Sequence, residues 1–438
     1  MPRVPISRHP GRRFAGRIGS WIVLCILCFM SLGAQAAVVD EVVRNLMREH
    51  RITGLSLAII QDGKIVKAKG FGFTDRSCQT AVTPGTLFQA GSISKAVAAV
   101  GVLRLVQEGR LSLDTDVNAY LRSWKVPENK FTKEQKVTLR RILSHTAGLT
   151  VHGFLGYATN GPVPTLLAVL DGTTPANSPA IRVDMVPGTK WRYSGGGYTV
   201  MQQMVIDVIG KPFPDFMSQT VLKPLGMTNS TYEQPLPQRM AGADAAGYRA
   251  NGEAVPGRWR VHPELAAAGL WTTASDLARF ALGIQQSLAG DSNTVLSQAT
   301  TRLMLTNAKD GDGLGLFVDG TGEALRFSHG GRNMGFDSFL IAYAGIGKGA
   351  VIMMNANESW ASRTIVNAIA KEYAWSGGIP LIPPAWQRDE LMNAHPRIVS
   401  GGVIVCCGLA MVAVVGWRKI LKRCWRANDV AYCETHPC

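Results

Sequence analysis

Hydrophobic periodicity predicts strands at both ends of the middle of this chain. Residues 38–50 carry apolar side chains at helical spacing and predict an entry helix. Residues 54–60 form a largely apolar run, and residues 64–70 form a second strand-like segment after a short polar stretch with Asp-Gly at 62–63. An Asp-Gly pair between two such runs is typical of a tight β-hairpin turn. We therefore expect an antiparallel strand pair at the start of this region.

The remaining pattern is largely helical. Residues 96–108 predict an apolar helix, and residues 134–290 are mainly helical in pattern with several Gly and Pro breaks. Two strand-like runs follow at 339–343 and 349–354, and an amphipathic helix at 361–375. Strands at both ends with helices between them predict an α+β fold, in which one antiparallel sheet flanked by helices is joined to a mainly helical lobe. We expect the functional site in the cleft between the two.

The two termini have the pattern of membrane signals. An Arg-rich start precedes an apolar run at 21–32, and Ala34-Gln35-Ala36 fits a small-x-small cleavage site, so the segment is a signal peptide or an N-terminal anchor. Residues 398–417 carry no charge and are followed at once by a basic cluster, which predicts a transmembrane helix with a cytoplasmic end. The predicted organisation is a signal segment at 1–36, a central domain at 37–375, a linker at 376–396, a transmembrane helix at 397–417 and a basic tail at 418–438. The domain is therefore expected on the periplasmic or extracytoplasmic side of the inner membrane, with the lipid bilayer as a partner.

Charge and cysteine usage exclude several classes of function. Much of the net charge of +15 lies in the two termini, and the middle has no Lys/Arg run with interleaved aromatic residues, so no nucleic-acid partner is predicted. Cys78 is the single cysteine of the middle, which excludes an internal disulfide there. His145 and His152 lack the spacing of a helical zinc motif and are interpreted as structural. We predict no metal and no organic cofactor.

Candidate chemistry centres on Ser92 and Lys95, which stand one helical turn apart. Residues i and i+3 share a helix face, and a serine hydroxyl needs a base within hydrogen-bond reach to act as a nucleophile. A helix that starts at Ser92 would also offer free N–H groups to a developing oxyanion. The same four residues fit a helix N-cap serine followed by a surface lysine, so the pattern alone leaves both interpretations open.

The wider sequence resembles the class C β-lactamase-related serine hydrolases, a family that includes penicillin-binding DD-peptidases, D-aminopeptidases and esterases. Residues 88–95, Phe-Gln-Ala-Gly-Ser-Ile-Ser-Lys, are similar to the first motif of that family. Further matching stretches follow in the family's order at 143–149, 187–194, 223–227, 267–276 and 327–331. The resemblance covers about residues 40–375. It implies a β-lactamase/transpeptidase-like fold and acyl transfer through Ser92.

The resemblance also implies roles for the second motif. Tyr193 would act with Lys95 as general base and acid toward Ser92. Gly195 stands where the family's Tyr-x-Asn motif has an asparagine that helps to hold the substrate amide. Efficient recognition of β-lactams is therefore not expected.

The third motif is His329-Gly330-Gly331 where well-studied relatives have Lys-Thr-Gly or His-Thr-Gly. His329 keeps a donor that can be cationic near its ordinary pKa of about 6.5. Gly330 lacks the hydroxyl that would bind a substrate carboxylate, and Gly331 would keep the strand edge open to a substrate backbone. By family geometry the oxyanion hole is formed by the backbone N–H groups of Ser92 and Arg332. The Arg332 side chain would either replace the lost carboxylate contact or lie in solvent.

These observations predict a membrane-anchored extracytoplasmic serine hydrolase that acts on amide, peptide or ester bonds of a small molecule or peptide, with weak β-lactamase activity at most. The alternatives are a β-lactamase or DD-carboxypeptidase proper, a peptidase that trims acylated peptide precursors, and a non-catalytic penicillin-binding sensor. A sensor needs a cytoplasmic output domain, and the 418–438 tail is too short to form one.

Overall fold

The computed structural model describes residues 38–77, 80–306, 312–345 and 347–375. All of them lie in one compact unit. The predicted signal segment, linker, transmembrane helix and basic tail lie outside the described residues, as does Cys78. Within the described ranges, none of the helices combines the length and the apolar character that crossing a bilayer requires.

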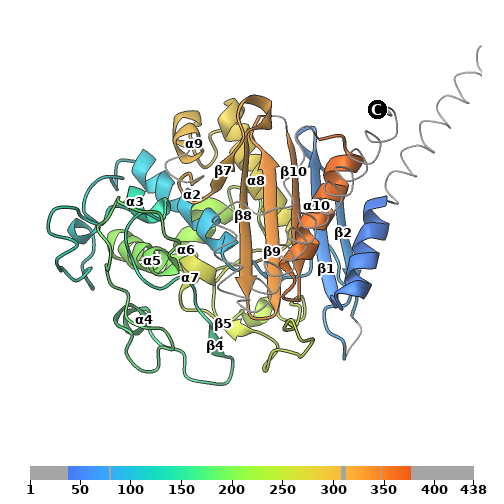
Figure 1. The fold of residues 1–438 in the computed structure, drawn as a ribbon, viewed down its shortest axis with the longest axis horizontal. Coiled ribbons are helices and arrows are strands. Elements are labelled where there is room, and N and C mark those ends of the chain that lie inside the picture. The colour runs from blue at the N-terminus through green and yellow to red at the C-terminus, as the bar shows by residue number, and fades with distance from the viewer. Residues whose placement is uncertain (1–37, 78–79, 307–311, 346, 376–438) are drawn as a thin grey trace, which may run out of the picture. The chain divides into compact units, whose positions relative to one another are not determined.

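The centre of the fold is a six-stranded antiparallel sheet (Figure 1). Its spatial order is β2 (Lys64–Gly72), β1 (Gly54–Gln61), β10 (Lys348–Met354), β9 (Phe336–Tyr343), β8 (Arg326–Asn333) and β7 (Phe317–Asp319). Strand β1 pairs with β10, so the first hairpin and the last strands form one sheet, which confirms the prediction. Asp62 and Gly63 both have positive φ, as the predicted hairpin turn requires.

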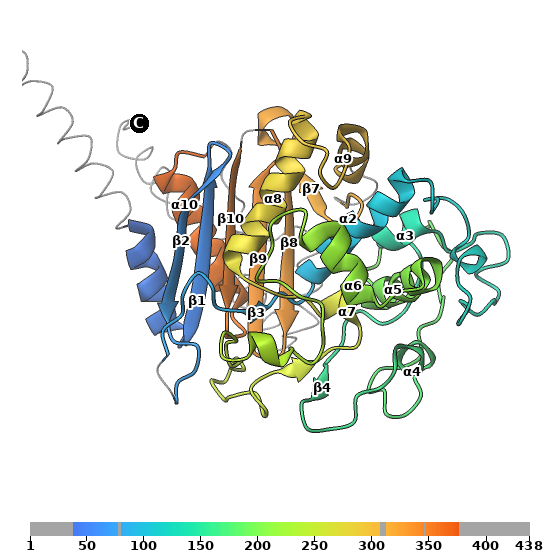
Figure 2. The same cartoon turned by 180° about the vertical axis from the view of Figure 1, so that it is seen from behind.

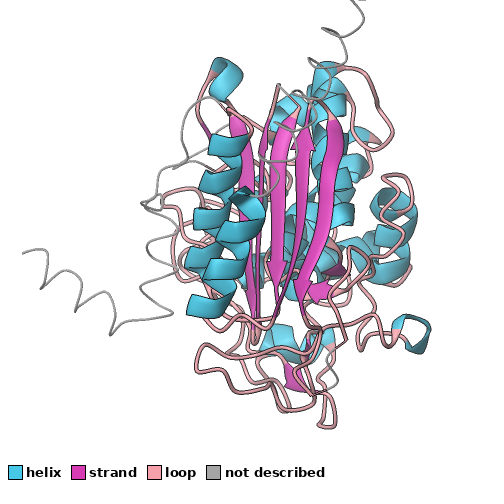
Figure 3. Cartoon of the chain, turned by 90° about the vertical axis from the view of Figure 1, so that its right-hand side faces the viewer, coloured by secondary structure: helices cyan, strands magenta, loops and turns pink. Residues whose placement is uncertain are grey.

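Both faces of this sheet are buried under helices (Figure 3). In β1, Leu55, Leu57 and Ile59 pack into one apolar cluster, which also contains residues of the helical segment 38–49 and of α10 (Ser359–Glu372). Ala58 and Ile60 point to the other face and join the main core. Side chains of a strand alternate between faces, so burial on both faces explains the unbroken apolar runs of these strands.

The second lobe is built from helices, long loops and short strand pairs. The helices between the first hairpin and the last strands belong to this lobe or cover the sheet. They are α2 (Ile93–Gln107), α3 (Leu139–Leu143), α4 (Leu166–Asp171), α5 (Gly195–Ile209), α6 (Phe213–Met217), α7 (Leu265–Ala268), α8 (Ala274–Ala289) and α9 (Gln298–Met304). The two-stranded sheets are β3 (Phe88–Gln89) with β6 (Trp271–Thr272), and β4 (Tyr157–Ala158) with β5 (Arg260–Val261). Residues 134–290 are therefore less helical than predicted, because loops and short strands separate the helices. Seen from behind, α8 lies across the sheet (Figure 2).

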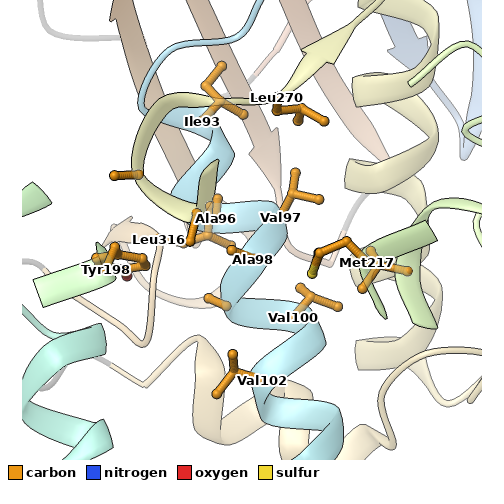
Figure 4. Close-up of a cluster of buried hydrophobic side chains, with 14 of the residues drawn as sticks. Ile93, Ala96, Val97, Ala98, Val100, Val102, Tyr198, Met217, Leu270 and Leu316 are labelled. Atoms are coloured by element: carbon orange, nitrogen blue, oxygen red, sulfur yellow. The ribbon is translucent and has the colours of Figure 1, made fainter. Parts of the chain in front are cut away.

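Helix α2 is buried along nearly its whole length. Its side chains Val97, Val100 and Val102 project into the core with Met217 and Leu270 close by (Figure 4). A helix that is apolar all round lies inside a protein rather than at its surface. The N-terminus of α2, where Ser92 lies, is therefore held by packing on most sides.

Candidate active site

Short strand pairing and a glycine turn deliver Ser92 to the start of α2. Strand β3 pairs with β6, and the Ala90 N–H donates to the Leu270 carbonyl at 2.9 Å. Gly91 has φ +52°, a left-handed conformation that glycine adopts at little cost. Ser92 follows as the N-cap residue of α2. The predicted position of Ser92 at a helix start is confirmed.

Strand β8 packs directly against this turn. A Cβ added to Gly91 would lie 2.5 Å from the Arg332 nitrogen, and one added to Gly331 would lie 1.9 Å from the Ala90 oxygen. The Ser338 hydroxyl on β9 donates to the same Ala90 oxygen at 2.7 Å. Gly331 thus admits the Ala90 carbonyl, a close backbone contact that leaves no room for a Cβ.

Lys95 lies within hydrogen-bond reach of Ser92. Its Nζ donates to Ser92 Oγ at 2.9 Å and to the Ala267 carbonyl at 2.8 Å, and the residue is 2% exposed. The shared helix face predicted from the spacing is confirmed. Ala267 belongs to α7, which sequence analysis placed in a motif without giving it a role. Its carbonyl orients the ammonium toward the serine.

Aromatic rings surround the lysine. The Tyr193 ring centroid lies 4.9 Å from Lys95 Nζ, and Tyr193 is 7% exposed. The His145 ring packs on Tyr193 with centroids 4.3 Å apart, and its Nδ1 accepts the Ser194 N–H at 3.1 Å. Burial and the charge of Lys95 hold the pKa of His145 well below its usual value, which keeps the ring neutral and able to accept. His145 therefore supports the tyrosine.

His152, interpreted from sequence as structural, lies on an exposed loop beside the site. Its ring centroid is 4.9 Å from that of Tyr193. Desolvation of the ring and the charge of Lys95 lower the pKa of His152. Sequence spacing carried no signal for this contact, because His152 and Tyr193 meet through the tertiary fold.

His329 is buried and neutral, so the prediction that it can be cationic is wrong. The residue is 3% exposed, and burial with the charge of Lys95 lowers the pKa of His329 to about 3. Its Nδ1 lies 2.5 Å from the Gly330 carbonyl, an arrangement that requires the proton on Nδ1. In this tautomer the neutral ring presents Nε2 as an acceptor and offers no donor to a carboxylate.

Arg332 forms a bidentate ion pair, which corrects both sequence interpretations of its side chain. Its Nε and one terminal nitrogen donate to the two Asp337 carboxylate oxygens at 2.7 and 2.8 Å. Asp337 is 3% exposed and lies opposite Arg332 in the β8–β9 register. The Arg332 guanidinium therefore anchors the hairpin, and the Arg332 backbone nitrogen lies close to Gly91.

A buried acid–base pair close to the site was missed by the sequence analysis. Glu264, the N-cap residue of α7, and His262 are both 0% exposed, with Glu264 Oε2 3.9 Å from His262 Nδ1. Burial raises the pKa of Glu264 to about 8 and, with the charge of Lys95, lowers the pKa of His262 to about 3. Both groups are thus neutral near pH 7.

In the part of the chain that the structure describes, no group of three or more His, Cys, Asp or Glu residues could hold a metal ion.

The amino-acid sequence is similar to the β-lactamase family and to penicillin-binding proteins. The family model described as Beta-lactamase matches residues 39–374. Penicillin-binding protein 4 of Amycolatopsis lactamdurans is 30% identical over 264 residues, covering 59% of this chain and 66% of that protein. Protein flp of Staphylococcus aureus (strain N315) is 26% identical over 223 residues, covering 49% and 41%. The chain thus spans about half the length of the first curated relatives it matches.

Solved structures share the fold. The octameric penicillin-binding protein homologue from Pyrococcus abyssi superposes with a TM-score of 0.62 at 23% identity, covering 78% of this chain and 77% of that one. The crystal structure of SurE gives a TM-score of 0.61 at 25% identity, covering 81% and 79%. The expected β-lactamase/transpeptidase-like architecture, an antiparallel sheet with helices on both faces, is confirmed.

Proposed function

The chain belongs to the β-lactamase family of serine hydrolases, and on this premise we propose that it transfers acyl groups through Ser92. One observation carries the proposal. Lys95 Nζ lies 2.9 Å from Ser92 Oγ, with Tyr193 beside the ammonium and Ser92 at the N-terminus of a buried helix. A serine needs a base at this distance to become nucleophilic.

The proposed reaction has two halves. The Ser92 proton passes to the Tyr193 phenolate, which the Lys95 ammonium stabilises, as Oγ bonds to the substrate carbonyl carbon. The backbone N–H groups of Ser92 and Arg332 stabilise the oxyanion. The proton then passes to the leaving group as its bond to the carbonyl breaks. Water attacks the acyl-enzyme, releases the acid and restores the Ser92 hydroxyl. Residues of this chain carry out every step, and no cofactor is needed.

We propose substrates without a carboxylate next to the scissile bond, namely uncharged amides, peptides or esters. The groups that would bind such a carboxylate are absent at the third motif or otherwise engaged: His329 is neutral, Gly330 has no hydroxyl, and Arg332 pairs with Asp337. A β-lactam carries this carboxylate, so β-lactamase activity should be weak. A DD-carboxypeptidase is the second candidate, favoured by the similarity to penicillin-binding proteins.

An active-site acylating probe tests the chemistry. A fluorophosphonate should label the wild-type chain and leave Ser92→Ala unlabelled. The control variant Ser123→Ala, which removes a hydroxyl that donates a hydrogen bond to Asp207, should be labelled like the wild type. Equal labelling of wild type and Ser92→Ala would refute the proposal that Ser92 is the nucleophile. Nitrocefin turnover as fast as that of a dedicated β-lactamase would refute the substrate class. An acyl-enzyme that persists without product release would instead favour a penicillin-binding sensor.

The proposed location follows from sequence. The apolar runs at 21–32 and 398–417, with the basic cluster after the second, support a domain held outside the inner membrane by a C-terminal anchor. Such a site would also suit a peptidase that trims acylated peptide precursors. Fractionation of cells should place the full chain in the membrane and a chain lacking 398–417 in the periplasm. Full-length chain in the soluble cytoplasmic fraction would contradict the proposal.

A further inference from the structure

A capping loop, residues 150–155, closes the N-terminal end of α5 beside Tyr193. Three successive carbonyls of the loop accept hydrogen bonds from the start of the helix. These bonds run from the Gly195 N–H to the His152 oxygen at 3.0 Å, from the Gly196 N–H to the Val151 oxygen at 2.9 Å, and from Ser194 Oγ to the Thr150 oxygen at 2.9 Å. The first N–H groups of a helix lack partners within it, so the loop satisfies them. The carbonyls of residues 150–152 are thereby engaged with the start of the helix.

Two glycines allow this close approach. A Cβ added to Gly196 would lie 2.4 Å from the Thr150 oxygen. A Cβ added to Gly195 would lie 3.0 Å from the His152 oxygen and 3.1 Å from the Phe154 ring. A side chain at position 195 would therefore press tightly against the His152 carbonyl and the Phe154 ring. Glycine at position 195, where the family has an asparagine, therefore leaves the space that the Phe154 ring borders.

The loop is held firmly and borders the catalytic residues. Val151 has φ +66°, which a β-branched residue adopts only when its surroundings hold it there. The His152 ring lies 4.9 Å from the Tyr193 ring. Phe154 is half-buried against the main core, and Leu155 is 66% exposed. The loop therefore places the His152 ring against Tyr193 and the Phe154 ring against Gly195, two residues further along the chain.

We infer that Phe154 is a specificity-determining residue, and that the capping loop selects esters whose acyl group is apolar beside the carbonyl over acylamino donors such as peptidyl groups. The inference rests on the proposed function and narrows its substrate class. An acylamino donor carries an N–H and a C=O that lose water when they enter the site. The loop offers them an aromatic ring, and its nearest carbonyls already accept from α5. A desolvated amide without partners costs enough to lower kcat/KM about tenfold.

A matched pair of substrates tests this inference on the full-length protein. Pentanoate and N-acetylglycine have acyl chains of similar length, and as p-nitrophenyl esters they share one leaving group. Each kcat/KM is divided by the rate of hydroxide hydrolysis of the same ester. The wild type should prefer the pentanoate by about tenfold. Phe154→Asn, which replaces the aromatic ring of the capping loop by an amide, should bring the ratio of the two corrected kcat/KM values toward one. Phe154→Ala should lower kcat/KM for the pentanoate alone.

Leu167→Ala on α4, which removes a partly exposed leucine outside the loop, should leave the ratio unchanged. Melting temperatures of the variants report whether each one folds. A wild-type ratio near one, or a ratio that is the same in folded Phe154→Ala and wild type, would overturn the inference while leaving Ser92 chemistry intact. Absence of Ser92-dependent turnover of both esters would overturn the inference together with the proposed function.

Discussion

Replacement of Glu264 by glutamine should make the protein more stable near neutral pH. The carboxyl group is fully buried 3.9 Å from the neutral His262, and its pKa is raised by burial to about 8, compared with an ordinary value of 4.5. Between these two pH values the folded chain holds a proton that the unfolded chain has lost. The free energy of unfolding therefore falls as pH rises from the unfolded to the folded pKa of Glu264. The stability that this proton contributes is complete below the unfolded pKa.

The magnitude follows from the size of this window. Each pH unit changes the free energy of unfolding by about 1.4 kcal/mol, so between pH 4.5 and pH 7 Glu264 should cost about 3 kcal/mol. Glutamine has nearly the same shape and does not titrate. Glu264→Gln should match the wild type at low pH and exceed its stability by about 3 kcal/mol at pH 7. His262 is present in both proteins, so its own opposite pH dependence cancels in the difference.

Urea unfolding at a series of pH values measures this difference, with the m-value as a check that the same surface is exposed. Glu128→Gln serves as the control, because this carboxylate is exposed and its pKa is lowered by Lys136, which places its titration below the window. A stability difference between Glu264→Gln and wild type that stays constant from pH 4.5 to pH 8 would refute the reasoning. The result also concerns the site, since Glu264 is the N-cap of the helix whose Ala267 carbonyl holds Lys95.

Two further predictions follow from the third motif. Gly331→Ala should lower activity about 100-fold, because its Cβ would lie 1.9 Å from the Ala90 oxygen and displace Ser92. Gly330→Ala, whose Cβ has its nearest neighbour at 3.9 Å, is the matched control, and equal activity of the two variants would contradict the packing argument. Because the pKa of His329 is about 3, a pH profile of kcat/KM should show no limb from this ring near pH 6.5. A limb there that His329→Gln removes would mean that the ring titrates with an ordinary pKa.

Much of the fold could be predicted because its signals are local. The 62–63 turn and the strand-like segments on either side of it specified the first hairpin, and the runs at 339–343 and 349–354 specified β9 and β10 to within a few residues. The lobe at 134–290 was predicted less well. Its short strands form through partners that are distant in sequence, as where Tyr157 pairs with Val261. Periodicity carries no signal for such pairs.

The candidate site divides in the same way. Ser92 and Lys95 meet because residues three apart share a helix face, a relation that the sequence alone determines. The protonation of His329, the pairing of Arg332 and the contact of His152 with Tyr193 depend on burial and on neighbours brought from distant segments.

For Gly195 the sequence showed that a side chain is missing, while the tertiary structure showed that Phe154 lies against the position where it would be. The sequence by itself thus predicted the meeting of Ser92 with Lys95, because the two residues lie within one helical turn. Only the tertiary structure decided what surrounds that pair, because desolvation and close packing act between residues far apart in the chain.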